Sequence, residues 1–137
     1  MSDYPDVPEP VLSLIRHVCT SLPEVVEEAA WTGTRWQIRS RTFAHVLVVE
    51  PERPEAFARA GRIDSTSTVL TFRSEAPEYD VLVRLGHPFF RAPWGEDTVG
   101  LIVADLHDSD EIRELLTDSY CILAPQKLVE AVDRPEI

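Results

Sequence analysis

The stretch Thr34–Val49 constrains the fold most, because its pattern is typical of a β-hairpin with two unlike faces. In its first half, Trp36 and Ile38 fall on one parity and polar residues on the other, which is the period of a strand with one buried face. Residues 42–49 are apolar at nearly every position, as in a central strand covered on both faces. Between them, Ser40-Arg41 lacks the Gly or Asn that two-residue turns usually contain, which leaves the turn type and register open. We expect the hairpin to have an apolar side and a cationic side, the latter carrying Arg35, Arg39 and Arg41.

The segments around the hairpin alternate between helical and extended periods. Ser74 is placed as the N-cap of a helix that Gly86 terminates, and Asp108 with Glu111 has the spacing of a capping box. An interior glycine such as Gly100 is typical of a bulge in a strand. The expected elements are a helix over 10–21, a short strand within 24–31, the hairpin, one helical turn and a loop within 55–66, a strand over 68–73, a helix over 75–85, a strand over 98–104, a helix opened by Asp108 and a short helix over 126–132.

This order predicts the fold class. Strands follow one another without intervening helices, so the sheet should be mainly antiparallel. We expect an α+β fold with two layers, in which the helices pack on one face of the sheet. No internal repeat or domain boundary is visible, and 137 residues of which 44% are hydrophobic suit a single domain spanning 1–137.

The segment Gly86–Gly95 is too rich in proline and glycine for a regular element, yet it holds three large aromatic side chains. Such a loop either plugs one end of the core or frames a pocket. Plugging is favoured because Phe89 and Phe90 would be costly to leave in water. The pocket alternative uses a set of flat and polar residues that could converge on a ligand: Trp36, His87, Arg91, Trp94 and Tyr120.

The charge distribution bears on possible partners. A net charge of −11 argues against general binding to nucleic acid, which draws its free energy from cations that displace counterions at phosphates. The acids are concentrated at the two ends, however: residues 31–95 carry seven acids and nine bases. A local anion-binding face on the hairpin therefore remains open, beside the simpler interpretation that its arginines are scattered over a solvated surface.

No membrane-spanning run is present and the first residues are acidic, so we expect a cytoplasmic protein without a membrane partner. Cys19 and Cys121 lie far apart and are expected to be reduced structural thiols in helices. Catalytic signatures and phosphate-binding glycine loops are absent. The acids of residues 105–118 are spaced as helix caps and a solvated helix face. Because no histidine has a second ligand at helical spacing, we expect no metal site. Because the catalytic and cofactor signatures are absent, we also expect no cofactor and no catalytic residue. The histidines are His17, His45, His87 and His107.

Several short segments, taken in their order and spacing, resemble the MmcQ/YjbR-like family of small bacterial proteins. The most specific are Leu22-Pro23-Glu24 and the closing run that begins at Ser119-Tyr120 and continues through Ala124-Pro125 to Lys127-Leu128. Supporting segments are Trp31–Trp36 and His87–Arg91. The resemblance covers about residues 10–130. It implies a CyaY-like (frataxin-like) α+β fold and a DNA-binding role through a double-wing arrangement of strands and loops. The family has no settled enzymatic activity that the resemblance could carry over. A frataxin-like fold does not by itself transfer iron binding.

Two functions follow from these observations. The first is a non-enzymatic DNA-binding protein that uses Arg35, Arg39 and Arg41. The second is a protein-interaction or small-ligand module that uses the aromatic segment 87–94 to bind a small anionic ligand or a protein partner. An enzyme is a third alternative, for which the sequence identifies neither a nucleophile nor a base.

Overall fold

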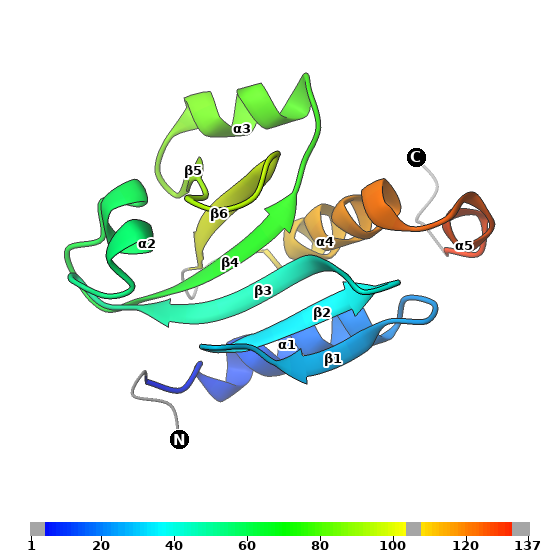
Figure 1. The fold of residues 1–137 in the computed structure, drawn as a ribbon, viewed down its shortest axis with the longest axis horizontal. Coiled ribbons are helices and arrows are strands. Elements are labelled where there is room, and N and C mark those ends of the chain that lie inside the picture. Colours follow the sequence, from blue (N-terminus) through cyan, green and yellow to red (C-terminus); the bar gives the residue numbers. More distant parts are fainter. Residues whose placement is uncertain (1–4, 104–107, 133–137) are drawn as a thin grey trace.

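The computed structural model describes residues 5–103 and 108–132, which form a six-stranded antiparallel sheet and five helices (Figure 1). The strand order is β1-β2-β3-β4-β6-β5, so β1 and β5 are the edges. The expected α+β class with a mainly antiparallel sheet is confirmed. The elements are α1 (Glu9–Thr20), β1 (Val26–Ala29), β2 (Thr34–Ile38), β3 (Arg41–Val49), α2 (Glu55–Ala60), β4 (Ser67–Arg73), α3 (Glu78–Leu85), β5 (Phe89–Arg91), β6 (Thr98–Val103), α4 (Ser109–Leu123) and α5 (Gln126–Glu130).

The main core lies between the sheet and the helices α1 and α4, which run behind the strands in Figure 1. The apolar stripe of each helix faces the same parity of the strands: Ile15 of α1 and Leu116 of α4 are fully buried with Trp36, Val46 and Leu70. Burying a side chain of this size stabilises the fold by about 1.5–3 kcal/mol. This layer closes one face of the sheet.

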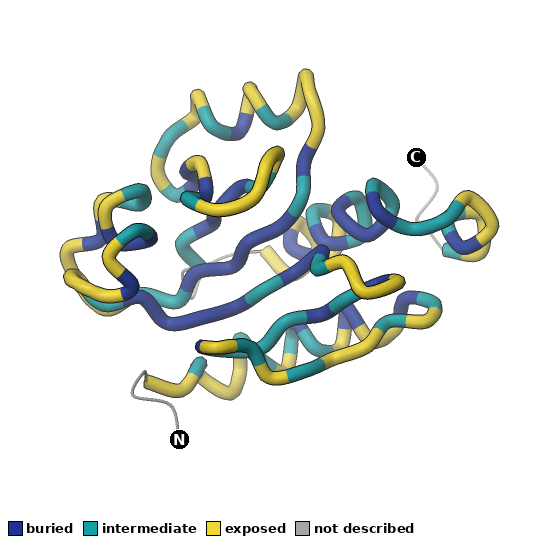
Figure 2. Tube along the Cα trace, viewed as in Figure 1, coloured by how far each residue is buried: buried dark blue, intermediate teal, exposed yellow. Residues whose placement is uncertain are grey.

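The opposite face is covered over only part of its area. There α2 places Phe57 and Ala58 over Leu47 and Val69, together with Phe90 of β5, in a second buried cluster. The expected two-layer arrangement is confirmed by α1 and α4, and the short helix α2 is an addition on the opposite face. The central strands are buried along most of their length, whereas the connection between β5 and β6 is exposed (Figure 2).

The hairpin has a turn that the sequence did not predict. Arg39 and Ser40, with φ of 51° and 66°, form the two-residue turn, rather than Ser40 and Arg41. Positive φ at both central residues is what a type I′ turn requires, although neither residue is Gly or Asn. The register also shifts between Trp36 and Gln37, which leaves Phe43 as the extra residue of a β-bulge. As a result Phe43 packs into the main core beside Ala44.

Three local predictions need correction. Ser74 is not a helix cap, because α3 begins at Glu78 with Pro77 as its N-cap, and a proline disfavours helical geometry in the residue before it. Residues 89–91 pair with β6 and form β5, where an irregular segment was expected. Gly100 keeps a regular register and is not a bulge; a Cβ at this position would lie 2.3 Å from the Phe90 ring, so the glycine makes room for that ring.

The predicted helix ends at Gly86 and Asp108 are confirmed. Gly86 is the C-cap of α3 and has a φ of 72°. Asp108 is the N-cap of α4, and its side chain accepts a hydrogen bond from the Asp110 backbone N–H at 2.9 Å.

Candidate functional site

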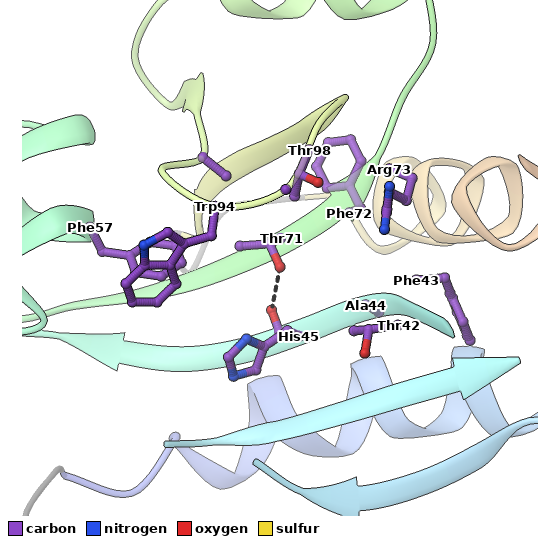
Figure 3. A pocket seen from close by; sticks show the side chains of 12 residues that line it. Thr42, Phe43, Ala44, His45, Phe57, Thr71, Phe72, Arg73, Trp94 and Thr98 are labelled. Atoms are coloured by element: carbon purple, nitrogen blue, oxygen red, sulfur yellow. Dashed lines mark hydrogen bonds between the residues drawn. The ribbon is translucent and has the colours of Figure 1, made fainter. Parts of the chain in front are cut away.

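A cavity of about 220 Å³ lies on the sheet face opposite α1 and α4. The alternation of β4 explains its position: Leu70 and Phe72 point into the main core, so Thr71 and Arg73 project to the other face. Its boundary combines β3, β4, the N-terminal part of α2 and the connection between β5 and β6 (Figure 3). The lining residues are Thr42, Phe43, Ala44, His45, Phe57, Thr71, Phe72, Arg73, Ala92, Trp94, Gly95 and Thr98.

Trp94 forms the aromatic rim of this cavity. Its side chain is half-exposed (53%), but it is held between two other rings. The Phe57 ring lies 5.2 Å away and the Trp31 ring 5.5 Å away, centroid to centroid, and both contacts are edge-to-face. Pairs of this geometry contribute about 0.5–1.5 kcal/mol beyond their buried area. The indole is therefore both accessible and oriented.

His45 lines the cavity, and one nitrogen of its ring is engaged in a hydrogen bond. Its Nε2 is 2.7 Å from the Thr32 carbonyl oxygen, which can only accept, so Nε2 carries the proton and Nδ1 has a lone pair. Burial lowers the pKa of His45, the bond to Thr32 opposes that change, and the charge of Arg35 adds to the lowering. The ring is accordingly neutral at pH 7. Thr32 itself is buried, and its hydroxyl has no hydrogen-bond partner among the described residues.

Arg73 lies at the end of β4, at the polar side of the cavity. Its Nη1 donates to the Glu96 carbonyl oxygen at 3.3 Å, and its backbone N–H donates to the Ser119 hydroxyl at 2.7 Å. Within residues 5–103 and 108–132, no carboxylate forms an ion pair with it. The cavity thus contains a cation whose guanidinium donates to a neutral carbonyl and forms no ion pair with a carboxylate of the described residues.

The three arginines predicted to bind DNA do not form one face. Arg35 forms an ion pair with Glu28, which lies directly opposite it on β1, and Arg39 lies in the turn and pairs with Glu24 at 3.1 Å. Arg41 is exposed and lies opposite Ile38, on the parity that faces the main core. The predicted cationic side of the hairpin is therefore wrong in its geometry, while DNA binding itself stays a prediction.

The residues predicted for a ligand site are mostly apart. Trp36 and Tyr120 are fully buried in the main core, where the Trp36 Nε1–H donates to Glu27 at 2.9 Å. His87 and Arg91 are exposed and do not line the cavity, which leaves Trp94 as the member of the set that does.

The aromatic segment does both things that the sequence left open. Phe89 and Phe90 are buried in the two cores, as the plugging interpretation predicts, and Trp94 frames the cavity. The sequence analysis missed His45, Arg73 and Phe57. The alternation in residues 68–73 could have placed Thr71 and Arg73 on the face away from Leu70, but nothing local indicates that Phe57 meets them.

The cysteines, the histidines and the acidic residues were also singled out in the sequence. Cys19 and Cys121 are free thiols in α1 and α4, as predicted, and burial raises the pKa of Cys19 far above its usual range. The described residues contain no group of three or more side chains arranged to hold a metal ion. His107 and Asp105 lie outside the described residues. None of the helices in the described part of the chain is long and apolar enough to cross a bilayer.

These features define a class of protein: a two-layer α+β protein with one sheet face closed by helices and a small aromatic-rimmed cavity on the other. Comparison with protein families is more specific. The YjbR family model matches residues 20–122, and the chain belongs to the YjbR family. The match includes the hairpin, every cavity-lining residue and most of α4. No curated protein and no solved structure matches the chain.

Proposed function

We propose that this YjbR-family protein binds a small molecule in the cavity between β3, β4, α2 and the β5–β6 connection. The observation that carries this proposal is Trp94, a large aromatic side chain that is half-exposed at the opening of the cavity. A ligand that covers its exposed face removes apolar area from water, which is favourable by about 25 cal/mol per Å². Because Phe57 and Trp31 already orient the ring, binding costs little side-chain entropy.

The size of the cavity limits the ligand. Sites for drug-sized molecules usually have about 300–1,000 Å³. The present cavity of about 220 Å³ suits a smaller compound, of the size of one ring with a few substituents. Its lining is typical of ligand sites, with aromatic side chains at one end and a few polar groups at the other.

Other predictions about the protein do not enter this proposal. DNA binding through Arg35, Arg39 and Arg41 is not the basis of the proposal, because two of these three charges are compensated by carboxylates. A cytoplasmic location, a non-enzymatic role and a single domain over 1–137 also stay predictions.

A thermal-shift screen of small metabolites tests the proposal, since a ligand that prefers the folded state raises the unfolding midpoint. We expect ligands that stabilise the wild type but not Trp94→Ala. The matched control is Leu85→Ala, because Leu85 is another exposed apolar side chain (65%) and does not line the cavity. A screen without ligands, or ligands that stabilise Trp94→Ala equally, would contradict the proposal.

A further inference from the structure

We infer that the ligand of this cavity is a small organic anion, whose carboxylate or phosphate group binds Arg73 and whose flat unsaturated body lies against Trp94. This inference rests on the proposed function and adds the chemical class of the ligand.

The charge of Arg73 is the first step. Five of the ten other arginines among the described residues form ion pairs with glutamates, whereas Arg73 does not; the paired ones are Arg16, Arg35, Arg39, Arg53 and Arg59. Arg73 has the Glu96 carbonyl instead, at 3.3 Å from Nη1. A guanidinium carries five N–H donors in a planar fork that matches a carboxylate or phosphate. Arg73 therefore retains donors for an anionic ligand.

The surroundings of Arg73 inside the cavity are the second step. The chain has 24 acidic residues and a net charge of −11, yet no carboxylate is among the cavity-lining residues that the structure describes. An acid of the ligand would thus meet a cation without a competing carboxylate in the lining. Thr42 adds a further donor, because its Oγ1 accepts from Gln37 Nε2 at 3.5 Å and keeps its own proton for a ligand oxygen.

The division of the cavity into two ends is the third step. Figure 3 shows Arg73 at one side and Trp94 with Phe57 at the other, with Thr71 between them on β4. The aromatic end offers ring faces and edges, which favour flat unsaturated groups. His45 lines the same cavity and has Nδ1 as an acceptor, so it suits an N–H or O–H of the ligand rather than a second acid.

Matched pairs of probes test this class by titration monitored through the backbone amide signals of the isotopically labelled protein. The pairs are benzoate with benzamide, indole-3-carboxylate with indole-3-carboxamide, and phenyl phosphate with phenol. Compounds of this size should bind with Kd of about 1 mM. We expect each acid to bind about tenfold more tightly than its neutral partner. Comparison of phenyl phosphate with benzoate shows whether a phosphate is preferred to a carboxylate.

Variants locate the preference. Arg73→Gln should reduce the acid-to-neutral ratio to about one, whereas Arg84→Gln, which removes one positive charge from α3 outside the cavity, should leave the ratio unchanged. Arg73→Lys keeps a cation and should retain most of the preference, so it separates loss of charge from any damage to β4. Trp94→Ala should weaken acids and neutral compounds alike.

The outcomes of these titrations are distinct. Equal binding of acids and neutral partners to the wild type would overturn the ligand class and leave the proposed function standing. An acid preference that survives in Arg73→Gln would overturn the role of Arg73. If none of the six probes shifts cavity signals at concentrations up to about 10 mM, the inferred class is wrong; the metabolite screen then decides the proposed function separately.

Discussion

The hydroxyl of Tyr120 on α4 donates a hydrogen bond to the backbone carbonyl of Pro23, across 2.7 Å. The Tyr120 ring is fully buried and makes an edge-to-face contact with the Phe43 ring, at 5.5 Å between centroids. Pro23 and Tyr120 belong to the two segments that carry the family resemblance most specifically, Leu22–Glu24 and the run beginning at Ser119. In the structure these two separated segments are in contact, and the hydrogen bond joins the C-terminal part of α4 to the segment after α1.

Replacing Tyr120 by Phe should therefore destabilise the protein without opening a large cavity. The substitution keeps the ring and removes the donor to Pro23, and the loss of one hydrogen bond costs about 1 kcal/mol. Urea unfolding measures the change. Tyr79→Phe is the matched control, because the Tyr79 hydroxyl forms no hydrogen bond with any other described residue. Equal losses in the two variants would show that the bond to Pro23 contributes nothing.

Ser119→Ala should have a larger effect. The Ser119 hydroxyl is fully buried, donates to the Phe43 carbonyl at 2.6 Å and accepts from the Arg73 backbone N–H at 2.7 Å. Its removal leaves two main-chain groups of β3 and β4 without this partner, and an unsatisfied buried group costs about 1–3 kcal/mol. Ser13→Ala, which removes an exposed bond to Glu9, should change the unfolding free energy far less. A Ser119→Ala midpoint equal to that of Ser13→Ala would contradict this account.

The elements of the fold were predictable where the apolar period was regular. The helix expected over 10–21 is α1, and the strand expected over 68–73 is β4, within one residue at each end. The hairpin turn was missed because Arg39 and Ser40 adopt positive φ without being Gly or Asn. Because this turn pairs Arg41 with Ile38, the two side chains share a face, so counting parity along the sequence assigns Arg41 to the wrong face.

The candidate site was less predictable than the fold. Arg35 meets Glu28 only because of the register between β1 and β2, which the sequence did not fix. The cavity joins Arg73, Phe57 and Trp94 from three separate segments, and their approach depends on tertiary packing. Periodicity reports which side of an element is buried, but not which elements meet.

The stability of the protein should depend on the protonation of His45. Burial holds the pKa of folded His45 below the value of about 6.5 of an unfolded histidine. Between these two pKa values the unfolded chain binds more protons, so the free energy of unfolding rises with pH. This stabilisation is fully present above about pH 6.5 and is lost as the pH falls towards the folded pKa.

Urea unfolding of the wild type and His45→Gln at several pH values around and below 6.5 measures this effect. We expect the wild type to lose more stability on acidification than His45→Gln, whose amide can still donate to the Thr32 carbonyl. His87→Gln, at an exposed position, should follow the wild type. If His45→Gln and the wild type lose stability in parallel, the ring of His45 is not kept neutral by its environment.

The sequence predicts DNA binding, but the ion pairs of the hairpin lead us to expect the opposite result in a mobility-shift experiment with mixed-sequence DNA at low salt. Arg35 and Arg39 are each compensated by a glutamate, so in a chain with a net charge of −11 we expect no retention of DNA by the wild type. The triple substitution of Arg35, Arg39 and Arg41 by Ala should behave in the same way. Its stability should also change little, because half-exposed ion pairs contribute about 0–1 kcal/mol.

Retention by the wild type that weakens in the triple variant, with a flatter salt dependence, would instead establish the hairpin arginines as a DNA-binding surface. The same variant should keep the ligand response of the cavity, since none of the three arginines lines it.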